Sequence, residues 1–210
     1  MFTGIIKELG IVTEIKKVRE GIKFSIKSKK VIKSLKVSDS VAINGICHTV
    51  TNKSKNKFEF ISVPETLKKT NIGELTLNEE VNLENSLKVG EQIGGHFVFG
   101  HIDDVGIISS IKKIKSKSNR SYNFEFGIRI NKKYKKYIIN VGSISINGVS
   151  LTIAKIFPSR GKHFDIKVAI IPYTYKHTTF KNLQVKDKVN VEFDFIGKYV
   201  KNIIDNKLKK

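Results

Sequence analysis

The feature that most constrains the fold of this 210-residue chain is an internal repeat. The segment Ser40–Val50, SVAINGICHTV, returns as Ser143–Ile153, SISINGVSLTI, and matched residues lie about 100 positions apart, for example 103 for Gly45 and Gly148 (148 − 45). Three further blocks recur in the same order: the MFTGII opening, the strand before each proline, and EEVNLEN as DKVNVEFD. Ordered blocks at a nearly constant offset indicate two copies of one module.

Length and composition bear on the size of the domains and on the cellular compartment. Each module, near a hundred residues, is long enough to bury a modest core. The chain has one cysteine, Cys47, which excludes an internal disulfide and fits a reducing environment. No apolar run approaches the eighteen or so residues that span a bilayer, and MFTGIIKELG has no signal-peptide features. We therefore expect a cytoplasmic protein without membrane contact.

The formal net charge of +20 raises the question of nucleic-acid binding. Lysine is scattered along the chain, whereas a binding stripe needs basic residues interleaved with exposed aromatics on one face. The two basic clusters are Lys112–Arg120, which resembles a hairpin tip, and Lys132–Lys136. We expect no nucleic-acid partner. An affinity for single strands that falls steeply with salt would favour the opposite interpretation.

Short β-branched runs separated by turn signals predict an all-β fold. The expected strands are Leu9–Val18, Ile22–Lys27, Val41–Ile43, Ile46–Thr51, Phe58–Val63 and Glu80–Glu84, then Val105–Ile114, Tyr122–Ile130, Ser143–Ile146, Val149–Ile156, Phe164–Ile171 and Lys188–Phe195. The Asn-Gly pairs at 44–45 and 147–148 predict hairpin turns. Lys30–Lys36 and Asn131–Ile138 are candidate short helices. Six short strands per module predict two tandem Greek-key β-barrels.

The carboxy-terminal tail departs from this pattern. Its apolar residues follow the spacing of an amphipathic helix and are Ile196, Tyr199, Val200, Ile203, Ile204 and Leu208. A lone helix of this length needs a partner for its apolar face, which is either an oligomer contact or the helix's own barrel. We expect domain boundaries at 1–96 for the first barrel, 97–196 for the second and 197–210 for the helix.

The candidate chemistry lies in two equivalent positions. After each Asn-Gly turn stand two small polar residues, two apart and so on one side of a strand: Cys47 with Thr49, and Ser150 with Thr152. They are either a pair of sites or polar residues at tolerant hairpins. His101, in the glycine-rich GGHFVFGHID, is a second candidate, and His96 is expected to be structural. Histidine, cysteine and carboxylates do not occur at metal-ligand spacing, so no metal is expected.

Together these motifs resemble a known family. MFTGII, NGICHTV, VPET, GGHFVFGHID, NGVSLTI, IPYTYKHTTF and VNVEFD, from Met1 to about Tyr199, are similar to riboflavin synthase of the trimeric two-barrel type. The resemblance implies dismutation of two 6,7-dimethyl-8-ribityllumazine molecules by four-carbon transfer. The products are riboflavin and 5-amino-6-ribitylamino-uracil, and the reaction requires neither metal nor cofactor. It also implies a homotrimer whose sites lie between subunits, and it leaves open an association with a lumazine synthase shell.

The resemblance also implies which residues form the sites. Proton transfer would fall to Cys47, His101 and Ser150. One lumazine would contact Cys47, His48, Thr49, Ile61, Ser62, Val63, Pro64, Glu65, Thr66, His101, Ile102 and Asp103. The other would contact Gly4, Ile5, Ile6, Ser150, Leu151, Thr152, Ala169, Ile170, Ile171, Pro172, Tyr173 and Thr174. Phe2 and Thr3 would form a flap, and Asp194 would support the surrounding residues.

Four positions depart from the family pattern. Val141 stands at a usual Lys, His48 at a usual Leu, Tyr173 at a usual Glu and Asn147 at a usual Asp. The change at Tyr173 weakens the polyol contact that the resemblance implies for the second pocket. An alternative function is a lumazine- or flavin-binding protein of the same fold without turnover, which would saturate at one ligand per chain and leave it unconsumed. Both sites keep their polar pair, which favours the enzyme.

Overall fold

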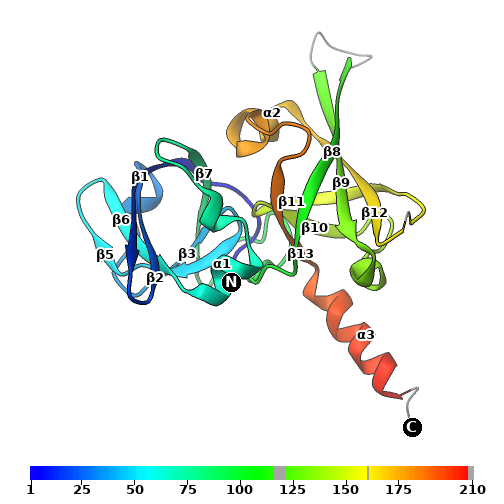
Figure 1. Cartoon of the computed structure of the whole chain (residues 1–210), viewed down its shortest axis with the longest axis horizontal. Helices are drawn as coiled ribbons and strands as arrows, with labels where there is room; N and C mark the ends of the chain where they lie inside the picture. Colours follow the sequence, from blue (N-terminus) through cyan, green and yellow to red (C-terminus); the bar gives the residue numbers. More distant parts are fainter. Residues whose placement is uncertain (116–121, 160, 208–210) are drawn as a thin grey trace.

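The computed structural model describes residues 1–115, 122–159 and 161–207, which form two β units and a projecting helix (Figure 1). The first unit contains β1 (Glu8–Val18), β2 (Gly21–Lys27), η1 (Val31–Lys33), β3 (Ser40–Ile43), β4 (Ile46–Thr49), β5 (Asn52–Lys53), β6 (Lys57–Ser62), α1 (Pro64–Lys69), η2 (Ile72–Glu74) and β7 (Glu80–Asn85). The second contains β8 (Asp104–Lys115), β9 (Tyr122–Asn131), η3 (Lys132–Tyr137), β10 (Ser143–Ile146), β11 (Val149–Ile156), β12 (His163–Ile170), α2 (Pro172–His177), η4 (Thr179–Lys181) and β13 (Lys188–Phe193), followed by α3 (Phe195–Lys207). The all-β prediction is confirmed.

The second unit is a closed six-stranded barrel in the order β10-β11-β12-β9-β8-β13. The first is a seven-stranded sheet, β4-β3-β7-β1-β2-β6-β5. The strand expected at Ile46–Thr51 ends at Thr49 as β4, and a separate short strand, β5, follows at Asn52–Lys53. At the division, Val50 turns its backbone to the preceding loop: its amide donates to Asp39 O (2.9 Å) and its carbonyl accepts from Ser38 N (2.8 Å). The next amide, Thr51 N, donates to Glu59 O of β6 (2.8 Å). The matched Ile153 also bonds to the loop before it, but β11 continues there and pairs with β12 from Ile153 onward, so only the second sheet closes.

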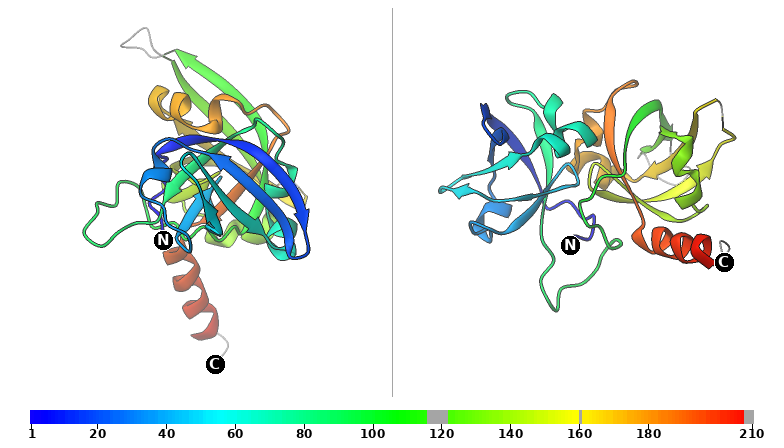
Figure 2. Two further views of the ribbon diagram at one scale, coloured as in Figure 1. Left: turned by 90° about the vertical axis from the view of Figure 1, so that its left-hand side faces the viewer. Right: turned by 60° about the horizontal axis from the view of Figure 1, so that its bottom comes forward.

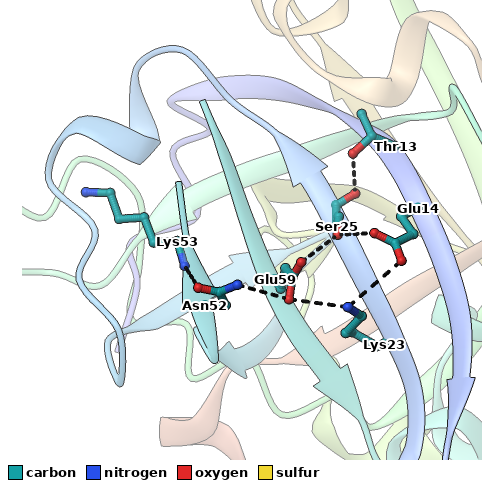
Figure 3. Close-up of polar contacts among 7 residues, drawn as sticks. All are labelled: Thr13, Glu14, Lys23, Ser25, Asn52, Lys53 and Glu59. Carbon is teal, nitrogen blue, oxygen red and sulfur yellow. Dashed lines mark hydrogen bonds and ion pairs between the residues drawn. The ribbon is translucent and has the colours of Figure 1, made fainter. Parts of the chain in front are cut away.

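A ladder of polar side chains on the first sheet joins β1, β2, β6 and β5 (Figure 3). Ser25 Oγ donates to Glu14 at 3.2 Å and to Glu59 at 3.4 Å. Lys23 Nζ lies 3.4 Å from the Glu59 carboxylate, and Asn52 Nδ2 donates to the same carboxylate at 3.4 Å. These pairs are part-exposed, so each contributes about 1 kcal/mol or less. Their role is to hold the two-residue β5 against the sheet.

The interior of each barrel is a packed core. Phe24 and Phe60 stack with ring centroids 5.3 Å apart in the first, and Phe126 meets Phe180 edge to face at 5.0 Å in the second. All four rings are buried. Because side chains fill the lumen at this density, a ligand must bind on the outer wall of a barrel.

The two Asn-Gly turns build the contact between the barrels. Asn44, Gly45, Asn147 and Gly148 all have positive φ, at 45°, 79°, 47° and 79°, as a type I′ hairpin turn requires. The turns lie back to back, and a Cβ on Gly45 would fall 2.5 Å from the Gly148 amide nitrogen. The predicted hairpins are confirmed, and the glycines have a second role because only a bare backbone fits this contact.

Buried asparagines repeat on both sides of that contact. Asn82 Nδ2 donates to Asn147 O at 2.9 Å, and Asn190 Nδ2 donates to Asn44 O at 3.0 Å. Each pair is the image of the other in the repeat, so the two barrels are related by an approximate twofold axis through the turns. All four residues are at least 96 % buried, and the side-chain oxygens of Asn44 and Asn147 accept in return from Asn82 N and Asn190 N, both at 2.8 Å.

The segments that precede the two barrels are exchanged. The first arm, residues 2–6, reaches the second barrel, where Gly4 O accepts a hydrogen bond from Ser150 N at 2.8 Å. The second arm, residues 97–102, reaches the first barrel, where Gly100 O accepts from Cys47 N at 3.0 Å. The arms pair with each other through Phe2 and Val98, and Figure 2 shows the amino terminus between the barrels.

The predicted carboxy-terminal helix is confirmed as α3, which projects away from the second barrel (Figure 1). None of its described side chains is buried, and Ile196, Tyr199, Val200, Ile203 and Ile204 remain between 46 % and 67 % exposed. Within the described residues, no helix is long and apolar enough to cross a membrane. Leu208 and residues 116–120, the expected hairpin tip, lie outside the part of the chain described.

Candidate functional site

A cavity of about 520 Å³ lies on the outer wall of the second barrel. Its walls come from the first arm, the loop before the second arm, β10 to β12 and the start of α2. Its lining residues are Ile5, Gly94, Gly95, Ser143, Ser150, Leu151, Thr152, Ala154, Ala169, Ile170, Ile171 and Thr174. A volume of this size and mixed lining suits a flat heterocycle with a polar tail. Eight of these residues were predicted from the sequence; Gly94, Gly95, Ser143 and Ala154 were not.

The remaining residues predicted for this pocket lie at or beyond its rim. Gly4 is buried in close contact with Ser150, and Ile6 packs against the core of the second barrel. Pro172 and Tyr173 begin α2 and are exposed. The Tyr173 ring stacks on the His177 ring of the same helix with centroids 4.1 Å apart, and neither ring lines the cavity.

Ser150 is the best-positioned nucleophilic or proton-transferring group of this cavity. Its Oγ lies 2.7 Å from Nδ1 of His96, although the sequence interpretation had left His96 as structural. Gly95 makes the approach possible, because a Cβ there would fall 2.7 Å from Ser150 Cβ and 2.2 Å from Thr3 O. Burial lowers the pKa of His96 while the nearby Asp194 opposes that effect, so the imidazole is neutral at neutral pH. A neutral imidazole beside a hydroxyl can pass a proton in either direction.

The matched position in the first barrel carries Cys47 and Thr49. Cys47 is half-buried and Thr49 is exposed, on the same outer side of β4 as predicted. The second arm covers Cys47 closely, and a Cβ on Gly100 would lie 2.6 Å from Cys47 Cβ. Gly100 has φ of +78°, which also favours glycine. The two sites thus share one design, in which a glycine of the exchanged arm lies over the polar residue.

His48 faces the core, which corrects the expectation that its side chain contacts substrate. Its Nε2 lies 2.7 Å from Ser62 Oγ and its Nδ1 3.1 Å from Ile46 O, and its ring lies 4.3 Å from that of Phe60. Burial lowers the pKa of His48 to about 4. Strand alternation is the cause: Cys47 and Thr49 point outward, so His48 between them points inward. Ser62, likewise fully buried, can reach a ligand only through its backbone.

The strand ends expected to grip a ligand edge are similar in the two modules. Val63 and Ile171 are extended residues that precede Pro64 and Pro172, the first residues of α1 and α2. Of the predicted first-site residues here, Ile61 and Thr66 are part-exposed and Val63, Pro64 and Glu65 are exposed. The modules differ in side chains: Glu65 forms an ion pair with Lys69 at 2.8 Å, which lowers the pKa of Glu65, and the matched residues are Tyr173 and His177.

The segment His101–Asp103 does not act as one unit. His101 is exposed beside Phe99, and Ile102 packs against the core of the first barrel. Asp103 accepts hydrogen bonds from Phe193 N at 2.9 Å and from Lys198 Nζ at 2.8 and 3.0 Å, so its carboxylate joins the second barrel to α3. Among the three, only His101 is free to face a ligand outside the barrel.

Two buried carboxylates form part of the sites although the sequence interpretation did not select them. Glu84 in β7 accepts from Thr3 N and Thr3 Oγ1, both at 2.7 Å, and from Gly4 N at 3.0 Å. Its counterpart Glu192 in β13 accepts from Phe99 N at 2.7 Å and Gly100 N at 2.9 Å. Burial raises the pKa of both carboxyls, that of Glu192 to about 7. The repeated VNLE and VNVE blocks carried the signal.

Asp194, the acid that the sequence interpretation did select, caps α3. Its Oδ1 accepts from Ile196 N at 3.0 Å, and its charge also acts on His96. It therefore supports the second site indirectly, through the histidine that contacts Ser150.

Comparisons with known proteins agree with this double arrangement. The family profile described as "Lumazine binding domain" matches twice, at residues 3–86 and 99–194. A riboflavin synthase of Bacillus subtilis (strain 168) is 38% identical over 200 residues, covering 95% of this chain and 88% of that protein. One from Actinobacillus pleuropneumoniae is also 38% identical, over 204 residues, with coverage of 97% and 90%.

A solved structure gives the same picture for the fold. LumP in complex with 6,7-dimethyl-8-(1'-D-ribityl) lumazine superimposes with a TM-score of 0.76 at 25% identity, covering 91% of this chain and 98% of that one. The chain thus combines two lumazine-binding repeats with 38% identity to a riboflavin synthase over 95% of its length. This chain belongs to the riboflavin synthase family.

Proposed function

We propose that the chain catalyses the dismutation of two 6,7-dimethyl-8-ribityllumazine molecules to riboflavin and 5-amino-6-ribitylamino-uracil. The observation that carries the proposal is that both repeats keep an outward polar pair under a glycine of the exchanged arm: Cys47 with Thr49 and Ser150 with Thr152. A reaction between two identical substrates needs two similar sites. The atoms of two lumazines make up both products, so the transfer requires no external oxidant or reductant.

Catalysis in this proposal is mainly orientation. Two flat heterocycles held face to face react as if within one molecule, and such positioning can supply roughly 7–11 kcal/mol of barrier reduction. The cavity on the second barrel would hold one lumazine against Ser150 and Thr152, with the strand end Ala169–Thr174 along the pyrimidine edge of that lumazine. The outer wall at Cys47 and Thr49 would hold the other, with Ile61–Thr66 in the matched role.

The proton steps fall to the groups nearest these walls. The reaction begins with loss of a proton from the acidic C7 methyl of one lumazine. The other lumazine is activated by addition of a nucleophile to its C7. In the second site the Ser150–His96 pair is the proton acceptor, since its neutral imidazole can take a proton through the hydroxyl. Cys47 and the exposed His101 are the corresponding groups beside the first site.

Assembly completes the site in this proposal. Both sites lie on outer walls, so two lumazines meet when the first barrel of one subunit faces the second barrel of a neighbour in a homotrimer. The exposed apolar stripe on α3 supports such a contact.

The domain boundaries in this proposal lie at residues 96 and 196, with the arms exchanged, and the protein is assigned to the cytoplasm. An association with lumazine synthase belongs to the same proposal.

The direct test supplies purified protein with 6,7-dimethyl-8-ribityllumazine and follows riboflavin by absorption and fluorescence. We expect riboflavin to accumulate, and its absence from folded, assembled protein would overturn the proposal. LumP is similar in fold and holds a bound lumazine in its structure, so the competing function is a binder that does not turn its ligand over. Such a binder would saturate at one lumazine per chain and return it intact, so ligand recovery separates the two functions.

A further inference from the structure

The two buried carboxylates are arranged in a crossed pattern. Glu84 belongs to the first barrel, yet the arm it holds, Thr3–Gly4, lies on Ser150 of the second barrel. Glu192 belongs to the second barrel, yet the arm it holds, Phe99–Gly100, lies on Cys47 of the first. Each acid is therefore hydrogen-bonded to the arm that lies on the opposite site, whereas on its own barrel one residue, Ala42 or Ser145, stands between it and Cys47 or Ser150 in the cross-strand register.

The link between acid and site is short and rigid at both ends. Glu84 accepts three hydrogen bonds of 3.0 Å or less from the first arm, and Glu192 accepts two from the second. Each arm glycine contacts the site through its carbonyl and through steric contact, since a Cβ on Gly4 or Gly100 would lie 2.6 Å from the Cβ of the polar residue beneath it. A shift of the arm must therefore move its contact with Ser150 or Cys47.

We infer that Glu84 and Glu192 are positioning residues that act across the boundary between the barrels, with Glu192 setting the environment of Cys47 and Glu84 that of Ser150. The inference deepens the proposed function, because it states how the two sites of that reaction are held. Its geometry is independent of turnover. The consequence is that damage to the acid of one barrel appears in the site of the other.

The chemistry of the anchors explains why a small change suffices. A carboxylate offers acceptors to two backbone amides at once, whereas the amide group of glutamine would place an N–H₂ against one of them. In a buried setting that leaves a donor without a partner, and the arm detaches more often. Protonation has the same effect, and burial brings the pKa of Glu192 to about 7, with Lys198 and Asp103 as the charged groups that face it.

The test uses Cys47, the single cysteine of the chain, as a reporter in the full-length assembled protein. We would measure the rate of Cys47 alkylation by iodoacetamide at pH 8 in the parent, Glu192→Gln and Glu84→Gln. With the Phe99–Gly100 arm loosened, alkylation in Glu192→Gln should rise by roughly tenfold. Glu84→Gln is the matched control and should raise the rate by much less, because the first arm contacts Cys47 only through Phe2 and its pairing with Val98.

The reciprocal experiment moves the reporter to the other site. In a Cys47→Ser/Ser150→Cys background, Glu84→Gln should accelerate alkylation by roughly tenfold and Glu192→Gln by much less. A change confined to the thiol on the acid's own barrel, equal changes at both thiols, or no change at either would overturn the inference. If a glutamine variant does not fold, Glu84→Asp or Glu192→Asp withdraws the carboxylate by one methylene and should give the same crossed pattern. Because alkylation needs no substrate, a failure of the proposed reaction would leave this result unaffected.

Discussion

The buried His48 makes stability depend on pH in a way that a ligand-facing histidine would not. Burial holds its folded-state pKa at about 4, below the ordinary value of 6.5. Between those values the unfolded chain binds a proton that the folded chain excludes. The stability contributed by the neutral ring is therefore present above pH 6.5 and is lost as pH falls toward 4.

The magnitude follows from the two pKa values. Taking 6.5 for the unfolded chain and about 4 for the folded chain, linkage gives a loss of about 2 kcal/mol in the free energy of unfolding between pH 7 and pH 5. The matched residue of the second barrel is Leu151, so His48→Leu is the replacement that the repeat itself suggests. Leucine removes the titration but leaves Ser62 without its partner, which costs about 1–3 kcal/mol at pH 7.

The assay is urea unfolding of the parent and of His48→Leu at pH 7 and pH 5. Other titrating groups are common to both proteins, so the difference between the two pH dependences isolates His48. We expect the parent to lose about 2 kcal/mol more than the variant on acidification. Equal losses in the two proteins would show that His48 titrates normally, and the assignment of its ring to the core would then be wrong.

Three further perturbations test the sites and the assembly. Ser150→Ala and His96→Ala should each lower kcat by roughly 10²-fold while the elution volume in gel filtration stays that of the parent, since each removes one member of the proton-transferring pair; full activity in both would exclude the pair. Glu192→Gln should abolish a pH dependence opposite in sign to that of His48. The raised pKa means that the folded state binds the extra proton, so parent stability falls by about 2.5 kcal/mol from pH 5 to pH 8, and urea unfolding should show a shallower fall in the variant. Deletion from Gly197 onward removes the apolar stripe of α3 and should give monomers in ultracentrifugation that bind lumazine but turn it over poorly; a truncated trimer would contradict the interface.

The sequence predicted the repeated architecture well because both of its signals are local. Alternating apolar runs and the Asn-Gly pairs specify strands and turns within a few residues, and the spacing of Ile196 to Ile204 specifies a helix. The inward direction of His48 also follows from the sequence, because strand alternation that places Cys47 and Thr49 outward sends the residue between them into the core.

The exchange of the arms and the role of the buried acids could not be predicted in this way. Glu84 meets Thr3 across 81 residues of chain and Glu192 meets Gly100 across 92. No periodicity encodes such contacts, because they depend on how the two barrels pack. The contact of His96 with Ser150, 54 residues apart, is of the same kind. Local patterns fixed the walls of the sites, whereas the groups that hold and polarise them come from distant segments.

The measurement that tests the account most directly is the stoichiometry of a reaction run to completion with 6,7-dimethyl-8-ribityllumazine as the sole substrate. Two equivalent sites that hold two identical molecules predict one riboflavin and one 5-amino-6-ribitylamino-uracil for every two lumazines consumed. Lumazine that stays bound and is recovered unchanged from folded, assembled protein would contradict it.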